Sequence, residues 1–162
     1  MKKILILACG VLLFATSCFP GGGSPGSSSN AYSGYLTVKE ISTDKVTYSD
    51  ENAKVTVAIP NILEPKFDVV FNDMRFDSAM PVKLNIEFNG LPFKSTISED
   101  ETTLNYIFDA KDIVPTVGDV PYDKYKVDYI KGCIGRPVTI EFSISSKDKV
   151  VYFSTEKSEE NN

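Results

Sequence analysis

Apolar and polar residues alternate with a period of two in several stretches of this chain, and that alternation restricts the fold more than any other feature. In PVKLNIEFNG every second residue from Val82 to Phe88 is apolar, and PVTIEFSISS repeats the pattern from Val138 to Ile144. AKVTVAIP repeats it from Val55 to Ile59. Successive side chains of a strand point to opposite faces, so each stretch predicts a strand with one buried and one solvated face. Such strands are typical of antiparallel sheets.

Other segments also predict strands, with turn residues between most of them. They are Tyr35 to Ile41, Lys45 to Tyr48, Phe67 to Phe76, Phe93 to Ile97, Thr102 to Phe108, Tyr125 to Lys131 and Val150 to Ser154. We expect turns at 49–52, 89–90, 98–101 and 145–148. Prolines and glycine in 109–125 leave room there for one short helix at most. About ten short strands with closely spaced turns indicate an all-β barrel, with a two-sheet β-sandwich as the alternative.

The first 17 residues have the three parts of an export signal. Lys2 and Lys3 form a positive start, and the apolar core from Ile4 to Phe14 is shorter than the roughly 20 residues needed to span a bilayer. Ala15-Thr16-Ser17-Cys18 then resembles the lipobox of bacterial lipoproteins, which are cut before the cysteine and acylated on it. The resemblance implies a signal peptide at 1–17 and a lipid-bilayer anchor on Cys18.

Composition divides the remainder of the chain. Residues 18–33 predict the lipidated cysteine and a flexible tether, because glycine, serine and proline dominate there and cannot bury apolar surface. We place one β-barrel domain at 34–156 and a polar tail at 157–162. Without the signal the chain has 15 basic and 22 acidic residues, a formal charge of −7. This balance argues against nucleic acid as a partner, since nucleic acid is bound through basic patches.

Two segments carry a family resemblance. YSGYLTV, from Tyr32 to Val38, and the later FNDMRFDSAMPVKLNIEFNGLPF resemble the calycin-like β-barrel lipoproteins of Bacteroides-type bacteria. The resemblance extends over roughly Tyr32 to Phe153 and implies an antiparallel up-and-down barrel of about eight strands. The chain departs from lipocalins, which have a tryptophan after a glycine in the first strand, because it contains no tryptophan. It also implies attachment to the outer membrane, facing the periplasm because no acidic residue follows Cys18 directly, with surface exposure as the alternative.

A barrel of that size is either filled by its own side chains or holds one small ligand. The large inward candidates that could face a ligand are Phe71, Phe88, Phe108 and Phe142. The preferred function is a non-enzymatic binding module that holds a small apolar ligand or a glycan fragment in or at the mouth of the barrel. The alternative is a structural or interaction lipoprotein whose solid barrel docks an envelope protein.

Residues that could carry catalysis are sparse. The chain has no histidine, so Cys133 lacks the usual base for a thiolate and is better explained as a small buried hydrophobe. Asp73, Arg75 and Asp77 would share one face of a strand, where weak solvated ion pairs are commoner than acid–base catalysis. We therefore expect no enzymatic activity and no cofactor.

Three further features lie in loops and rims. Tyr122, Tyr125 and Tyr129 could stack on sugar rings, although packing at the barrel rim is preferred. The acidic residues at 99–101 and in 119–128 lack an EF-hand pattern, so we expect solvated turns and no metal site. Asp77-Ser78-Ala79 resembles the sequence to which Bacteroides-type bacteria attach O-glycans, which implies Ser78 as an O-glycosylation site in an accessible turn.

Overall fold

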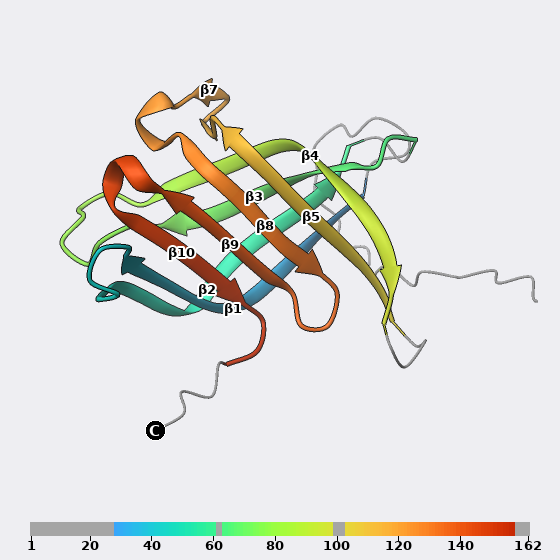
Figure 1. The fold of residues 1–162 in the computed structure, drawn as a ribbon, viewed down its shortest axis with the longest axis horizontal. Coiled ribbons are helices and arrows are strands. Elements are labelled where there is room, and N and C mark those ends of the chain that lie inside the picture. Colours follow the sequence, from blue (N-terminus) through green and yellow to red (C-terminus); the bar gives the residue numbers. More distant parts are fainter. Residues whose placement is uncertain (1–27, 61–62, 99–102, 158–162) are drawn as a thin grey trace, which may run out of the picture.

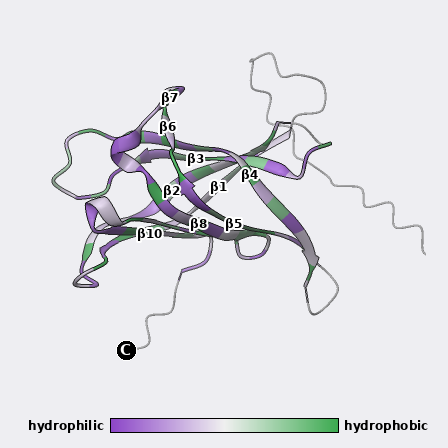
Figure 2. Ribbon diagram, turned by 45° about the horizontal axis from the view of Figure 1, so that its top comes forward, coloured by the Kyte–Doolittle hydropathy of each residue, from purple (hydrophilic) through white to green (hydrophobic). Residues whose placement is uncertain are grey.

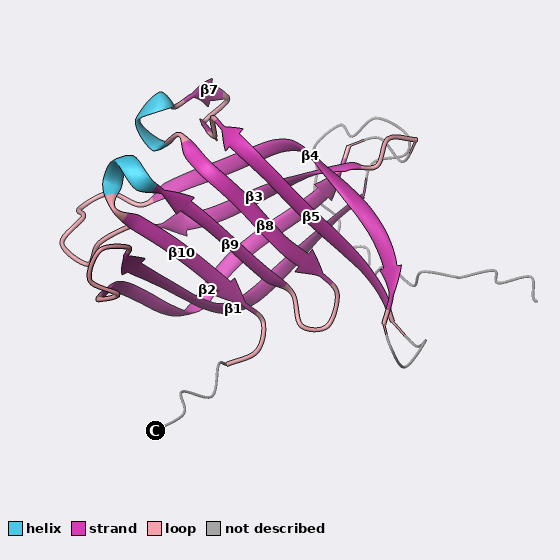
Figure 3. Ribbon diagram, viewed as in Figure 1, coloured by secondary structure: helices cyan, strands magenta, loops and turns pink. Residues whose placement is uncertain are grey.

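The computed structural model describes residues 28–60, 63–98 and 103–157, and strands make up most of them (Figure 1). The strands are β1 (Ser28–Glu40), β2 (Val46–Ile59), β3 (Lys66–Met74), β4 (Leu84–Ile97), β5 (Leu104–Ile113), β6 (Thr116–Val117), β7 (Val120–Pro121), β8 (Val127–Ile134), β9 (Thr139–Ile144) and β10 (Lys149–Ser154). Two short 3₁₀ turns, η1 (Asp123–Tyr125) and η2 (Ser145–Lys147), are the helical segments of the described chain (Figure 3). The all-β prediction is confirmed.

Eight strands form a closed antiparallel barrel of the calycin-like kind. Each pairs with the next along the chain, β5 passing directly to β8, while β6 and β7 form a small hairpin beside β4. Pairing of β1 with β10, from Tyr35 opposite Ser154 to Glu40 opposite Lys149, closes the ring. The up-and-down barrel prediction is confirmed, and the alternative of a two-sheet sandwich is wrong.

The up-and-down order sorts the connections into two groups. The loops 41–45, 75–83 and 114–126 lie with η2 at one end of the barrel, which we call the loop end (Figure 1). Ser28 and the residues that follow Ser154 lie at the opposite end, the terminal end, together with the β8–β9 turn. The chain segment that leads to Cys18 therefore joins the barrel at the terminal end.

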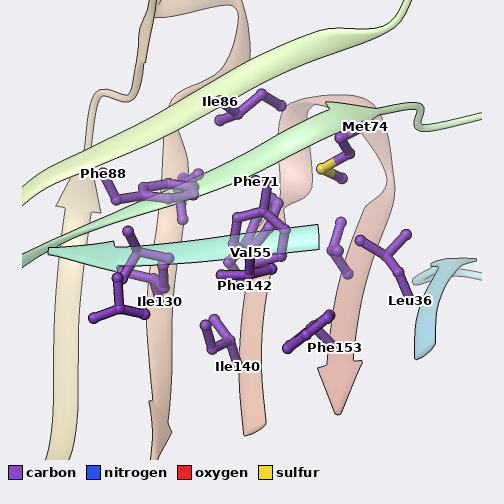
Figure 4. Packing of buried hydrophobic residues seen from close by; sticks show 14 of the residues in the cluster. Leu36, Val55, Phe71, Met74, Ile86, Phe88, Ile130, Ile140, Phe142 and Phe153 are labelled. Carbon is purple, nitrogen blue, oxygen red and sulfur yellow. The ribbon is translucent and has the colours of Figure 1, made fainter. Parts of the chain in front are cut away.

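Phenylalanine rings fill the middle of the barrel (Figure 4). The ring centroid of Phe71 on β3 lies 5.2 Å from that of Phe142 on β9, 6.1 Å from that of Phe88 on β4 and 6.3 Å from that of Phe153 on β10. Rings from strands far apart around the barrel thus meet in edge-to-face contacts, a favourable arrangement of aromatic quadrupoles. The strand ribbons carry hydrophobic and hydrophilic residues in alternation (Figure 2), as the period-two pattern predicts.

Several predicted boundaries are wrong. Residues 28–33, placed in the tether, form the first part of β1 and pair with β2, so the folded domain begins before residue 34. The turn predicted at 49–52 lies inside β2, where residues 51 and 52 form a β-bulge between the pairs Leu36–Asp50 and Gly34–Ala53. Val82, predicted to begin an inward-facing alternation, lies in the loop before β4 and is 56% exposed.

The Asn89-Gly90 pair makes a β-bulge and not the predicted hairpin turn. Phe67 pairs with Leu91 and Val69 with Phe88, so β4 has one residue more than β3 in this interval. Gly90 has a φ of +67°, a conformation that costs glycine little, and its N–H donates to the carboxylate of Asp68 at 2.7 Å. The bulge bends β4 where its pairing passes from β3 to β5.

Candidate binding site on the outer wall

Two adjoining depressions lie on the outer wall of the barrel. One, of about 370 Å³, is lined by residues of β5, β8, β9 and β10, and the other, of about 360 Å³, by residues of β4 and β5. Ile107, Phe108 and Asp109 border both. Beside the depressions the pairing partner of β4 changes. β4 pairs with β5 from Phe93 onward, whereas Glu87, earlier on β4, pairs with Thr116 of β6. Each volume is near the lower limit for small-ligand sites.

Four outward side chains cross the first depression in one line. Asp109 of β5 stands opposite Lys131 of β8, Lys131 stands opposite Glu141 of β9, and Glu141 stands opposite Tyr152 of β10. We call these four residues the cross-strand row. Directly opposed residues on neighbouring strands have Cβ atoms about 4.5–5.5 Å apart. The row therefore presents acidic, basic, acidic and aromatic groups at regular spacing.

Glu141 is held in place by two donors. The hydroxyl of Tyr129 donates to its Oε1 at 2.5 Å, and Nζ of Lys131 lies 3.1 Å from the same oxygen. Nζ of Lys131 also lies 5.0 Å from the centroid of the Tyr129 ring. Burial and the hydrogen bond to Glu141 raise the pKa of Tyr129 to about 12, so its hydroxyl remains a donor at neutral pH. Within the described chain no hydrogen bond reaches Oε2 of Glu141.

Apolar side chains border the same depression as these charged residues. The side chain of Ile107 is 47% exposed and that of Tyr152 is 39% exposed, and both border the first depression. Gly132 lies between them on β8, where a Cβ atom would overlap the carbonyl oxygen of Thr139 and approach the Phe108 ring to 2.8 Å. The site thus combines two exposed apolar side chains with fixed hydrogen-bonding groups, the usual make-up of a small-ligand site.

All four phenylalanines predicted to face a ligand are buried inside the barrel. Phe71, Phe88 and Phe142 contact one another, and Phe108 packs edge-on against Phe67 at 5.2 Å. Their location in the interior agrees with the alternation of the sequence. Their role toward a ligand stays a prediction.

The predicted trio of Asp73, Arg75 and Asp77 does not share a strand face. Strand β3 ends at Met74, and Asp73 has a φ of +54° at a register shift, which breaks the alternation. The Asp73 N–H donates to the Asn85 side chain at 2.9 Å, and the carboxylate of Asp77 accepts from the Ala79 N–H at 2.8 Å. No ion pair joins the three in the part of the chain that the structure describes.

The three predicted tyrosines separate into two groups. Tyr125 stacks on Phe76 with centroids 4.7 Å apart, and Tyr122 stacks on Tyr125 at 5.1 Å, so both pack at the rim of the loop end. Tyr129 instead belongs to the outer wall. Cys133 is half-buried on β8, and burial raises the pKa of its thiol, which disfavours the reactive thiolate.

Ser78 is exposed in the loop 75–83, and its backbone N–H donates to the carbonyl of Thr47 at 3.2 Å. Its O-glycosylation stays a prediction. The predicted signal peptide, Cys18, the tether up to residue 27, the acidic residues 99–101 and the tail from residue 158 lie outside the described residues.

The described segments contain no group of three or more acidic or cysteine side chains placed to hold a metal ion. Within the same residues, every helical segment is too short to cross a bilayer. Comparison with known proteins gives no match among protein families, curated proteins or solved structures.

Proposed function

We propose that this protein is a membrane-anchored lipoprotein and a non-enzymatic binding module whose ligand binds on the outer wall of the barrel. The observation that carries the proposal is the contrast between the barrel middle, where Phe71, Phe88 and Phe142 contact one another, and the outer wall, where two depressions adjoin at Ile107. Close-packed rings leave little room for a guest, because protein interiors pack at the density of organic crystals.

The proposed anchor is an acylated Cys18 in the outer membrane, with the barrel on the periplasmic side. Nine residues, 19–27, separate Cys18 from Ser28, where β1 begins. A flexible chain of that length has an average end-to-end distance of about 17 Å. The terminal end would then stay close to the bilayer, and the loop end, with Ser78, would point away from it.

Intact-mass measurement of the protein from membranes of its host tests the anchor. We expect a mass that begins at Cys18 and carries acyl chains, and Cys18→Ser should move the protein to the soluble fraction. A chain that retains residues 1–17, or one without lipid, would contradict this part of the proposal. Circular dichroism of Cys18→Ser should still report the β-barrel, because residue 18 precedes the folded domain.

Backbone NMR of the purified protein tests the location of the binding site. The probes are short aliphatic acids and mono- and disaccharides, each added at millimolar concentration. We expect shifts in amides of β5, β8, β9 and β10 around Gly132. Shifts centred on Phe71 and Phe88, together with saturable binding of a fluorescent fatty acid, would place the ligand inside the barrel and overturn the outer-wall site.

A second candidate function is docking of an envelope protein at the loop end. This end exposes several large apolar side chains, namely Ile41, Val46, Val82 and Val120. A photo-crosslinking residue at position 82 should then capture one defined protein in cells, whereas the same residue at position 97, at the terminal end, should not. Equal crosslinking at both positions would count against this function.

A further inference from the structure

Resting on the proposed outer-wall binding, we infer that the ligand is a neutral linear oligosaccharide that lies across the strands, along the cross-strand row. The four row residues are consecutive cross-strand partners from β5 to β10, so the row runs perpendicular to the strands. Strands of a sheet are about 4.8 Å apart. The rings of an extended oligosaccharide repeat at a similar distance, so successive rings can meet successive members of the row.

The row offers the groups that sugars require. Tyr152 exposes an aromatic ring, and rings of this kind present a broad apolar face with a polar tip, which suits the C–H face of a pyranose. Oε2 of Glu141 and the exposed carboxylate of Asp109 can accept hydrogen bonds from sugar hydroxyls. Hydrogen bonds to ionised groups are stronger than those between neutral groups.

The carboxylate of Glu141 is preorganised for this task. Tyr129 and Lys131 both bind Oε1, which fixes the orientation of the group and leaves Oε2 available. Fixing an acceptor before the ligand arrives lowers the entropy cost of binding. Tyr129 therefore acts as a positioning residue.

The charges of the row favour a neutral ligand. Lys131 lies between the carboxylates of Asp109 and Glu141, so the row has no continuous stretch of one sign. The adjoining depression is likewise lined by one basic and one acidic residue, Lys94 and Asp109. A polyanion would meet like charges at Asp109 and Glu141 and a polycation would meet one at Lys131, and such juxtapositions are unfavourable.

Pairing of the four strands argues against an extended peptide as the ligand. Peptides commonly bind sheets by adding a strand to an exposed edge. Strands β8, β9 and β10 each pair on both sides along the row, whereas the pairing of β5 with β4 ends at Phe108, so the row borders an unpaired strand edge only at its Asp109 end. Along the rest of the row, contacts must be made through side chains, as for a ligand laid on the face of the sheet.

Binding of defined oligosaccharides to the purified full chain tests the inference. A panel of neutral linear oligosaccharides, with uronic-acid and sulfated oligosaccharides of matched length, is screened and the hits are measured by calorimetry. We expect neutral members to bind, with affinity rising from disaccharide to tetrasaccharide as more of the row is occupied. Binding only of the acidic members, or of none, would overturn the inference.

Variants locate the bound sugar. Tyr152→Ala and Glu141→Gln should each weaken binding by about tenfold or more, while Tyr152→Phe, which keeps the ring, should bind nearly as wild type does. Tyr122→Ala, which removes an aromatic ring at the loop end, is the matched control and should leave affinity unchanged. Unchanged affinity in Tyr152→Ala and Glu141→Gln would overturn the inference.

Failure of the oligosaccharide assignment can be told apart from failure of the proposed function. Amide shifts on β5, β8, β9 and β10 with aliphatic acids, but none with sugars, would keep the outer-wall site and overturn the sugar ligand. Amide shifts centred on Phe71 with any probe would overturn both.

Discussion

Asp148 accepts two hydrogen bonds from Ser42, one from the backbone N–H at 2.9 Å and one from the hydroxyl at 2.5 Å. The N–H of Ile41 also donates to the carbonyl of Asp148 at 3.1 Å. These contacts join the β1–β2 turn to the turn after η2 and so connect the first hairpin of the barrel to the last at the loop end. The hydrogen bond from the Ser42 hydroxyl is the main reason that the pKa of Asp148 lies below its ordinary value of 3.8.

Ser42→Ala should lower the melting temperature at neutral pH, and the difference from wild type should shrink in acid. Because the pKa of Asp148 is lower in the folded state, its stabilisation is present above about pH 4 and is lost as the pH falls through the folded pKa. Circular dichroism melts from pH 7 to pH 2 check this. Ser95→Ala, an exposed serine of β4, is the control, and a Ser42→Ala deficit that is equal at both extremes would contradict the prediction.

Tyr129 should be among the last tyrosines to ionise. Its pKa is raised to about 12, so absorbance at the phenolate band should show one late titration step that Glu141→Gln moves back toward 10. The neutral hydroxyl stabilises the fold below about pH 10, and this contribution is lost as the pH rises through 12. If the Glu141→Gln titration is indistinguishable from that of wild type, the hydrogen bond between these two residues does not hold in solution.

Phe71→Ala should lower the free energy of unfolding by about 3–5 kcal/mol, because it leaves a cavity where three other rings make contact. Phe71→Leu should cost less, since it fills part of that space. Urea denaturation followed by circular dichroism measures both. Ile97→Ala, at a side chain that is 69% exposed, should change stability by less than about 0.5 kcal/mol. A loss below about 1 kcal/mol for Phe71→Ala would argue for a loosely filled barrel.

Gly132→Ala should destabilise the barrel more than Gly118→Ala. A methyl group at Gly132 would overlap the Thr139 carbonyl and press on Phe108, and overpacking of this kind costs about 1–3 kcal/mol. Gly118 has open space around it and carries only the strain of a φ of +57°, about 1 kcal/mol. The same urea experiment compares the two, and the reverse order would mean that β8 and β9 lie farther apart than described.

The period-two alternation was sufficient to predict the fold class and most strands, because burial of one face dominates strand formation. It placed Phe71, Phe88, Phe108 and Phe142 inside the barrel correctly. Turn propensity was less reliable. At 51–52 and 89–90 the polar and glycine residues form β-bulges within strands, because the strand pairing continues on both sides of each bulge.

The outer-wall site could not be predicted from the sequence. The alternation placed Glu141 on a polar strand face, and Lys131 ended another predicted strand, yet nothing local indicates that the two residues stand opposite each other. Register between β8 and β9 depends on the turn between them and on the fit of Ile130 and Phe142 inside the barrel. The prediction that Asp73, Arg75 and Asp77 share a strand face was wrong for a related reason. Asp73 has a positive φ at a register shift, and β3 ends at the next residue, Met74.

Closure of the barrel through β1 and β10 places the end of β10 beside the middle of β1, with Ser154 opposite Tyr35, and β1 extends seven residues beyond this pair to Ser28 at the terminal end. Neighbouring termini at the surface allow circular permutation, provided that the new ends open in an exposed loop. A linker that spans those seven residues, about 23 Å, between the natural ends, with new termini in the loop 75–83, would keep every strand pair of the barrel intact. The order of the strands around the barrel thus does not depend on where the polypeptide starts.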